Sequence, residues 1–503
     1  MNSFASSPRA PYIFFAIYAL AWTITATLSD VSYHFDIQEE IAWGKEWLIG
    51  LYRHPPMKVW LLEIANQATG FAEFTPYLLS TVLFGVGQVA IYWMLADVVS
   101  RRLAFFAVMS TTAVYLFGSQ LPLWNANTVQ FPFVGLFVLS VWRALDRRSP
   151  GWLVAAAVFA ACGVLGKYSY FLIIAPVALW ALVVPELRQR IAWRGLIIAI
   201  AVFAMLLAPN AFWFLTEGEP ARQFIANRTS ETYHGVLGAL LAAGEIVLIF
   251  IGLILAPALF GLFGLTAGDR LGEAELRLRR LLHVLGAAAV GSHLLILVVV
   301  LVTGTVVKDH WLMASLLTVP PFLVVFMHRH RQDVTLNRIG AVFCAAWLVG
   351  ILAAYPLERY VKLEGRPNGK PFAWFPVMPS QPLVDKATNF WTDLPSKAGQ
   401  TGFPDGPAFI AGGTVAALVA NNYPGRPSWL EGFSPALSPW VSVQDIQSKP
   451  FLSIGPVPTS FLERHDLCVV YHRRTMWKNI RGEDAREINF HAVAPQTYCE
   501  KTG

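Results

Sequence analysis

Residues 36–56 read Asp36-Ile-Gln-Glu-Glu-Ile-Ala-Trp-Gly-Lys-Glu-Trp-Leu-Ile-Gly-Leu-Tyr-Arg-His-Pro-Pro56 and come shortly after an apolar run over residues 10–29. At helical spacing, one face of residues 36–49 carries the apolar side chains of Ile37, Ile41 and Leu48. Another face carries two carboxylates and two indole rings, from Asp36, Glu40, Trp43 and Trp47. The two prolines end this helix, and residues 57–65 begin a second helix that is too short to span a bilayer. Both are predicted to lie as amphipathic helices at a membrane interface.

The carboxylate and indole face suits a sugar, because aromatic rings pack on apolar C–H groups while a carboxylate accepts a hydroxyl proton. The pattern therefore predicts a general-base site with Asp36 as the candidate base. A structural alternative stays open at this point. Asp36 with Glu39 also matches a capping box at a helix start, and tryptophans are common at membrane interfaces.

The rest of the chain has the composition of a membrane protein. It has 503 residues, of which 55% are hydrophobic and 14% charged, and its mean hydropathy is +0.50. These values exclude an ordinary soluble enzyme. A transmembrane helix needs roughly 20 apolar residues. About eleven runs approach that length: 10–29, 75–98, 102–119, 127–145, 151–167, 168–186, 195–212, 236–266, 282–304, 311–327 and 338–355.

The basic residues indicate how the chain crosses the membrane. The net charge is +6, but the lysines and arginines fall in short loops rather than in one patch, which argues against nucleic acid as a partner. The first run is predicted to be an uncleaved signal anchor, with the N-terminus in the cytoplasm. Alternate loops then place arginines such as Arg147 and Arg148 on the cytoplasmic side. The catalytic loop 30–74 and the tail after residue 355 are expected on the outer side.

The charge density rises after residue 355. Residues 356–503 hold 28 charged residues in 148 positions, whereas residues 1–355 hold 42. We therefore expect a transmembrane domain over 1–355 and a small extracytoplasmic α/β domain over 356–503, which acts as a lid, an acceptor-docking domain or structural support. Cys468 and Cys499 could pair in an oxidising compartment, although the sequence alone does not establish the pairing.

The order of these features resembles the GT-C fold glycosyltransferases that use polyprenyl-phosphate sugars. That family includes protein O-mannosyltransferases and the bacterial transferases that add aminoarabinose or galacturonic acid to lipopolysaccharide. Its first outer loop typically reads Asp-Glu-Ala-x-Tyr-Trp and then, after about a dozen residues, an aromatic residue, a variable residue, His, Asp or Lys, and Pro-Pro. Here Asp36 falls on the catalytic Asp, and His54 precedes Pro55-Pro56 at the matching spacing. Ile37 replaces the usual Glu, so the resemblance gives the base role to Asp36 alone.

Further short matches follow in family order up to about residue 330. Asn125-Ala-Asn127 stands where many relatives have Thr-Pro-Asp, and the missing acid argues against a divalent metal site. No metal ligand is assigned and no cofactor is evident, and a divalent metal is the disfavoured alternative. The substrate-binding residues that the resemblance implies are Glu39, Glu40, Trp43, Tyr52, His54, Asn125, Asn127, Lys167, Tyr168, Asn210, Lys308 and His310.

The resemblance implies an α-helical polytopic enzyme that transfers a sugar, with inversion, from a polyprenyl-phosphate donor. The expected acceptor is an envelope glycan or lipid of the lipopolysaccharide core or lipid A type, at the outer face of a bacterial inner membrane. Asp36 would take the proton of the acceptor hydroxyl, while cationic groups would stabilise the leaving phosphate. Lysines at span ends often snorkel to the interface instead, and His54 could simply cap its Pro-Pro turn. The alternatives are a protein O-mannosyltransferase and a non-catalytic lipid flippase or transporter.

Overall fold

The structure, a computed structural model, describes residues 2–229, 235–268, 276–331, 333–363, 374–397 and 403–499. These form two compact units. The first unit contains Met1–Thr25, Ile49–Lys58 and Ala72–Ala354, and the second contains Ala26–Leu48, Val59–Phe71 and Tyr355–Gly503. The second unit therefore includes two segments of the loop 30–74 in addition to the C-terminal residues.

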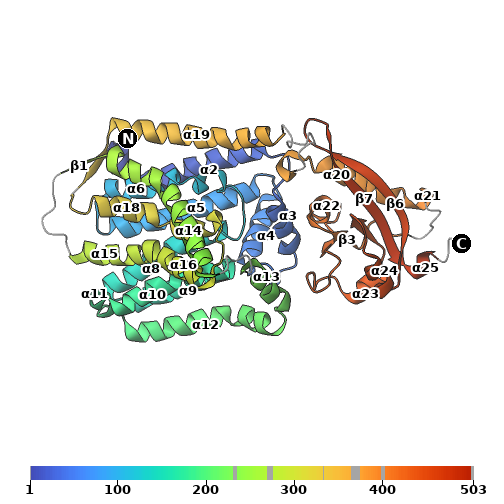
Figure 1. Cartoon of the computed structure of the whole chain (residues 1–503), viewed down its shortest axis with the longest axis horizontal. Helices are drawn as coiled ribbons and strands as arrows, with labels where there is room; N and C mark the ends of the chain where they lie inside the picture. Colours follow the sequence, from blue (N-terminus) through green and yellow to red (C-terminus); the bar gives the residue numbers. More distant parts are fainter. Residues whose placement is uncertain are drawn as a thin grey trace. The chain divides into compact units, whose positions relative to one another are not determined.

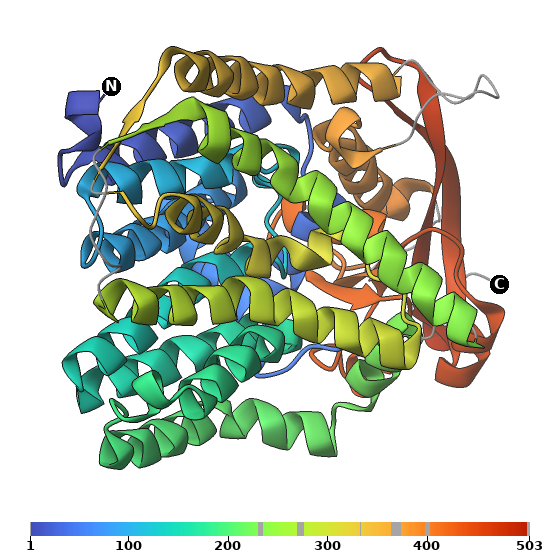
Figure 2. The same cartoon turned by 60° about the vertical axis from the view of Figure 1, so that its left-hand side comes forward.

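Seven helical segments among the described residues are long and apolar enough to cross a membrane. In the first unit most of these helices run roughly alongside one another, while the helix of residues 235–259 crosses them obliquely in the second view (Figures 1 and 2). A helix suits this environment because its backbone donors and acceptors are paired within the segment. The segments are α2 (Ala10–Ser29), α5 (Thr75–Ala96), η2 (Thr128–Gln130) with α8 (Phe131–Arg147), α12 (Trp193–Thr216), α14 (Gly235–Leu259) with η4 (Phe260–Gly264), α15 (Leu276–Gly286) with η5 (Ala287–Gly291) and α16 (Ser292–Thr303), and α19 (Arg338–Leu363).

The run over residues 102–119 does not form the single span that the sequence predicted. Helix α6 (Arg101–Met109) is followed by η1 (Ser110–Ala113) and the short α7 (Leu116–Ser119). The hydroxyls of Ser110 and Thr112 donate to the carbonyls of Ala107 and Met109, three residues back. Such bonds compete with the regular helical ladder, and Val114 is then extended. Apolar composition alone therefore overestimated this span.

Three other predicted spans are shorter or bent. Helices α9 (Pro150–Gly166) and α10 (Phe171–Val183, preceded by η3, Tyr168–Tyr170) are apolar but shorter than a full span. η6 (Asp309–Leu312) with α17 (Met313–Leu316) meets α18 (Val319–Met327) at 55°. Pro320 and Pro321 begin α18 and donate no backbone hydrogen bond to the preceding turn. By length and composition the described residues thus hold seven spans, or eight with the bent pair, against the eleven predicted.

Short elements connect the long helices of the first unit. The antiparallel pair β1 (Leu265–Ala267) and β2 (Val334–Leu336) joins two loops. Arg143 Nε lies 3.2 Å from Asp97 Oδ2, and Arg102 Nη1 lies 2.9 Å from Asp333 Oδ2, so ion pairs link the helix ends to neighbouring loops. The remaining short helices are α1 (Asn2–Ala5), α11 (Pro185–Arg188) and α13 (Glu219–Thr229).

The C-terminal part of the second unit is the small α/β domain that the sequence predicted. Its five-stranded mixed sheet has the order β4-β3-β5-β7-β6, and β6 and β7 form a long twisted ribbon (Figures 1 and 2). β3 pairs in parallel with β4 and β5, and β7 pairs antiparallel with β5 and β6. The strands are β3 (Phe409–Gly412), β4 (Ser428–Glu431), β5 (Phe451–Ile454), β6 (Leu467–Lys478) and β7 (Asp484–Pro495).

Helices cover this sheet and complete its core. The central strands β3 and β5 are buried along their whole length, as is usual for strands covered on both faces. Phe409, Phe451, Phe461 and Val493 lie together in the core. The helices and turns of this part are η7 (Phe375–Val377), α20 (Gln381–Thr392), α21 (Leu394–Lys397), α22 (Thr414–Asn422), α23 (Val443–Ser448), α24 (Thr459–His465) and α25 (Gln496–Cys499).

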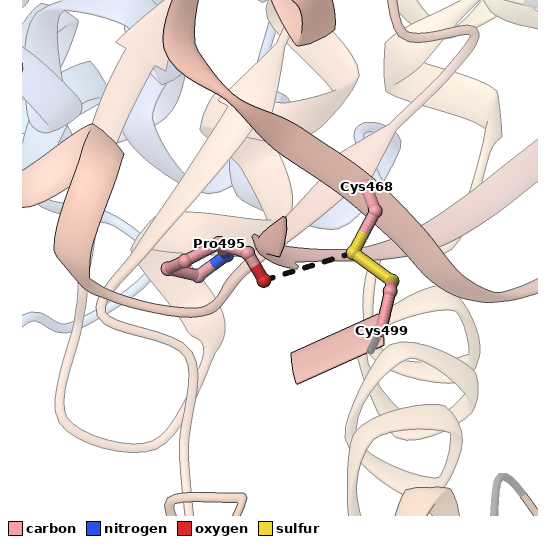
Figure 3. Close-up of a disulfide and its surroundings, with 3 residues drawn as sticks. All are labelled: Cys468, Pro495 and Cys499. Atoms are coloured by element: carbon pink, nitrogen blue, oxygen red, sulfur yellow. Dashed lines mark hydrogen bonds between the residues drawn. A yellow bond between two sulfur atoms is a disulfide. The ribbon is translucent and has the colours of Figure 1, made fainter. Parts of the chain in front are cut away.

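A disulfide joins Cys468 on β6 to Cys499 in α25 (Figure 3). Cys468 Sγ also lies 3.7 Å from the carbonyl oxygen of Pro495 on β7. The bridge ties the last described helix to the edge strand of the sheet. The pairing that the sequence left open is therefore present in the structure.

Candidate functional site

Asp36 lies in the first turn of α3 (Phe35–Gly44), in the second unit. The residue that caps this helix is His34, whose Nδ1 accepts the Asp36 N–H at 3.4 Å. The capping-box alternative for Asp36 is therefore not what the structure shows. The Asp36 side chain is 39% exposed, and its Oδ2 lies 3.5 Å from His34 Nδ1. An exposed carboxylate beside a ring nitrogen is free to accept a proton from a bound hydroxyl.

His34 lies between acidic and basic groups. Burial lowers the pKa of His34. The nearby carboxylates of Asp36 and Asp30 act against that shift, whereas the positive charges of Arg359 and Lys362 add to it. Asp30, just before α3, accepts hydrogen bonds from Arg359 Nε at 2.8 Å and from the Tyr355 hydroxyl at 2.9 Å. This buried ion pair fixes the segment that leads into α3. The neutral form of His34 is the one that can accept the Asp36 N–H.

The predicted helical face of residues 36–49 is interrupted. Helix α3 ends at Gly44, and Trp47 has a positive φ of 49°, so Trp47 does not continue the face of Asp36 and Glu40. A Cβ at Gly44 would lie 3.1 Å from the Val59 carbonyl oxygen of α4 (Met57–Thr69). The close approach of α4 therefore suits a glycine at this position.

Three of the predicted substrate-binding residues on α3 are buried within the second unit. Glu39 and Glu40 are each 2% exposed and Trp43 is 1% exposed. Glu39 Oε1 accepts the Thr414 hydroxyl at 2.9 Å, and the ring of Trp43 stacks on Trp429 with centroids 6.1 Å apart. Their substrate contacts stay a prediction. The contacts of Glu39 and Trp43 hold α3 against α22 and β4.

In the first unit, Lys167 is the centre of a cationic cluster. It follows the end of α9 with an extended backbone, and its Nζ donates to Asn127 Oδ1 at 2.7 Å. The Nζ also lies 5.8 Å from the ring centroid of Trp311. The protein atoms around this ammonium lower its pKa to about 8, and the nearby Lys58 adds to the shift.

Sequence comparison with the family motif missed Lys58. The residue is 3% exposed, and the indole of Trp124 donates to its carbonyl oxygen at 3.1 Å. The available signal was its position two residues after Pro56, directly behind the matched motif. Two lysines brought close together repel each other, so an anion between or beside them would be stabilised.

Asn210 and Tyr168 position the chain that leads into the Pro-Pro motif. The Tyr168 hydroxyl donates to Asn210 Oδ1 at 3.0 Å, and Asn210 Nδ2 donates to the Ile49 carbonyl at 2.7 Å. Asn125 serves its own turn, because its Oδ1 accepts the Asn127 N–H at 2.8 Å. Asn210 and Asn125 thus make structural contacts, and their roles toward substrate stay predictions.

The other predicted residues of the first unit are more dispersed. Tyr52 and His54 lie edge-on against Phe224 of α13, with centroids 5.9 and 6.0 Å away. Lys308 is exposed. His310 Nδ1 lies 3.3 Å from Oδ1 of its neighbour Asp309. The structure therefore gathers Lys167, Asn127, Lys58 and Trp311, and places the other residues in separate contacts.

Metal-binding side chains do not gather in the described ranges. Within them, no three His, Cys, Asp or Glu residues are arranged to hold an ion. Whether the protein needs a metal stays a prediction.

Similarity to known proteins identifies this arrangement of helices. Residues 53–213 match the dolichyl-phosphate-mannose-protein mannosyltransferase family. ArnT from Cupriavidus metallidurans bound to undecaprenyl phosphate aligns with a TM-score of 0.54 and 13% identity, over 96% of this chain and 98% of ArnT. Its apo state gives a TM-score of 0.55 and 12% identity, over 97% and 98%. This is the GT-C fold. The predicted fold class is confirmed, and the chain is a multi-span membrane protein.

One sequence relative is a lipid A galacturonosyltransferase. The lipid A galacturonosyltransferase RgtD of Rhizobium johnstonii is 22% identical over 227 residues. That alignment covers 42% of this chain and 44% of RgtD, so the chain matches less than half of that relative's length. The mannosyltransferase family match begins at Arg53 and includes Lys58, Asn127 and Lys167. Asp36 lies before it.

Proposed function

We propose that this chain transfers a sugar from a polyprenyl-phosphate-linked donor to a glycan or lipid of the cell envelope. The observation that carries the proposal is the Lys167 ammonium, which donates to Asn127 Oδ1, lies 5.8 Å from the Trp311 ring centroid and is affected by the charge of Lys58. A lysine ammonium among protein atoms, where water is scarce, favours an anion whose charge grows as a bond breaks. A phosphate that leaves a sugar is such an anion.

Asp36 is the proposed general base. The acceptor hydroxyl attacks the anomeric carbon and its proton passes to the Asp36 carboxylate. The bond between that carbon and the phosphate oxygen breaks with its electron pair on the phosphate, so the sugar inverts and the lipid phosphate leaves. His34 holds the backbone of Asp36 in the first turn of α3.

The acceptor that fits best is of the lipid A or lipopolysaccharide type. RgtD, a lipid A galacturonosyltransferase, supports it. The description of the matched family favours a second candidate, a Ser or Thr hydroxyl of a secreted protein. We place the reaction on the outer face of a bacterial inner membrane. The Cys468–Cys499 disulfide supports this side for the C-terminal part of the chain, because disulfides persist in oxidising compartments.

Mass spectrometry of envelope lipids and glycans, from cells that lack the chain and from rescued cells, tests the proposal. We expect one sugar-sized mass difference to disappear and to return with the wild type and with Asp405→Asn, a change at an exposed carboxylate of the same unit. Asp36→Asn should not restore it. A loss confined to secreted proteins would favour the second candidate. No change in any glycan would contradict transfer.

A further inference from the structure

Three segments of the first unit meet where α8 ends, where α10 connects to α12, and where α15 begins (Figure 1). Arg277 of α15 binds the Asp146 carboxylate with two nitrogens, at 3.1 and 2.8 Å. Arg190 donates to the carbonyl oxygens of Leu145 and Asp146, at 2.8 and 2.5 Å. Residues from distant parts of the sequence are thus held around the end of α8.

Among the described residues of these segments, positive charge exceeds negative charge. Arg279 pairs with Glu186 at 2.7 Å, and Arg277 pairs with Asp146, so the two carboxylates are already engaged. The described arginines of the three segments are Arg147, Arg148, Arg188, Arg190, Arg277, Arg279 and Arg280. Among the residues of these segments that the structure describes, two carboxylates face seven guanidinium groups, and this imbalance gives a positive potential.

The arginines are close enough to affect one another. Burial lowers the pKa of Arg190. The positive charges of Arg280, Arg148 and Arg277 lower it further, and the negative charge of Asp146 raises it. Arginines whose only role is to set the orientation of the chain in the membrane are expected to extend their side chains into water, where their mutual repulsion is screened. Here Arg190 and Arg277 are fixed by hydrogen bonds instead.

Arg280 supplies the second observation. Its Nε is shielded from solvent, and among the residues that the structure describes it has no hydrogen-bond partner. A buried guanidinium nitrogen without an acceptor destabilises the fold. An oxyanion would satisfy this donor, because guanidinium groups match the geometry of phosphate oxygens.

We propose that this arginine cluster binds a phosphate group. The cluster lies where α9 begins and α10 ends, whereas Lys167 follows the other end of α9. The seventeen residues of α9 separate the two places by about 25 Å, so the cluster is distinct from the proposed donor site. The fitting chemistry is a phosphate monoester or diester. Its source is either the headgroup of an anionic phospholipid or a soluble phosphate, and the proposal does not depend on sugar transfer.

Native mass spectrometry of the full chain in detergent, with phosphatidylglycerol or phosphatidylcholine added, tests the lipid source. We expect the wild type to retain phosphatidylglycerol preferentially. Arg280→Gln should weaken retention by about tenfold, as should Arg148→Asn, which removes an exposed charge at a left-handed position that Asn accepts well. Arg101→Gln, at an exposed arginine of α6, is the matched control and should retain the lipid like the wild type.

Thermal stabilisation of delipidated protein by inorganic phosphate or pyrophosphate tests the soluble source. Stabilisation that Arg280→Gln and Arg148→Asn lose, and that Arg101→Gln keeps, would support the site with a soluble ligand. The melting temperature of each variant without ligand shows whether it is folded. If Arg280→Gln does not fold, Arg148→Asn still shows whether the cluster binds phosphate. Equal retention of both lipids together with no effect of either phosphate would overturn the proposal. An equal loss in Arg101→Gln would also overturn it.

Discussion

Asp36 and Lys167 are the two residues on which the proposed chemistry depends, and their surroundings differ. The Asp36 side chain is partly exposed, whereas Glu39 and Glu40 of the same helix are buried. The Lys167 ammonium is held by Asn127 among protein atoms. A base must reach a substrate proton, and a phosphate ligand works best where water is scarce, so each environment suits its assigned role.

Replacing Asp36 with Asn should abolish sugar transfer while leaving the protein folded. A positioned general base contributes about 10²–10⁴ in rate. An acid in the first turn contributes only about 0.3–1 kcal/mol to stability through the helix dipole, and His34, not Asp36, caps α3. Single-turnover transfer and thermal unfolding in detergent check the two expectations. A transfer rate within tenfold of wild type would remove Asp36 as the base.

Donor binding should weaken as the pH rises through about 8. Lys167 has its pKa lowered to about 8, so in the free protein it loses its charge above that pH. A donor phosphodiester keeps one negative charge throughout this range, and only the protonated lysine attracts it. The dissociation constant should therefore be about tenfold larger at pH 9 than at pH 7.

Titration of the purified protein with a polyprenyl phosphodiester at several pH values measures this effect. Lys167→Arg should keep its charge and bind equally at pH 7 and pH 9, because arginine does not deprotonate in this range. A wild-type affinity that is constant from pH 7 to pH 9 would show that Lys167 does not contact the phosphate.

At the scale of elements, the most informative contact is between α3 and the C-terminal part of its unit. Asn421 Nδ2 donates to the Gln38 carbonyl at 2.7 Å, Thr414 to Glu39, and Trp429 stacks on Trp43. After α3 ends, Lys45 Nζ donates to the carbonyl oxygens of the loop before β4. These contacts fix the helix that carries Asp36, so the C-terminal part is expected to position the base.

Thr414→Val should slow transfer without weakening donor binding. The change leaves the buried Glu39 carboxylate without this donor, at a cost of about 1–3 kcal/mol, and allows α3 to shift. We expect kcat to fall while the donor dissociation constant stays unchanged. Thr392→Val, at an exposed threonine of α20 that bonds only within its own helix, is the control. Equal kcat for the two variants would contradict a positioning role.

At the scale of the whole molecule, the disulfide between Cys468 and Cys499 bears on the stability of the C-terminal part. Cys468 and Cys499 are 31 residues apart, and a loop of that length corresponds to about 3–4 kcal/mol by the chain-entropy relation. Cys468→Ser with Cys499→Ser should destabilise the C-terminal part by up to that amount. Thermal unfolding with and without reductant measures it, and no difference would show that the bridge adds no stability.

The same bridge tests orientation in cells. The chain has four cysteines, and Cys162 and Cys344 are free. After acid quenching and denaturation, a maleimide should label two thiols before reduction and four after it. Four labelled thiols before reduction would place the C-terminal part in a reducing compartment and contradict an outer location.

The sequence by itself determined the membrane class, the GT-C resemblance and the presence of a small C-terminal α/β domain, because composition and hydrophobic periodicity are local properties. It also proposed Asp36 as the base from a local motif, and that role stays a prediction. Only the tertiary structure showed that 102–119 breaks, because hydroxyl contacts with neighbouring carbonyls interrupt the helix. It alone joined Lys58 with Lys167, and Glu39 with Thr414, 375 residues apart. Such groupings follow from packing and hydrogen bonds between distant segments, for which no local pattern of residue types provides a signal.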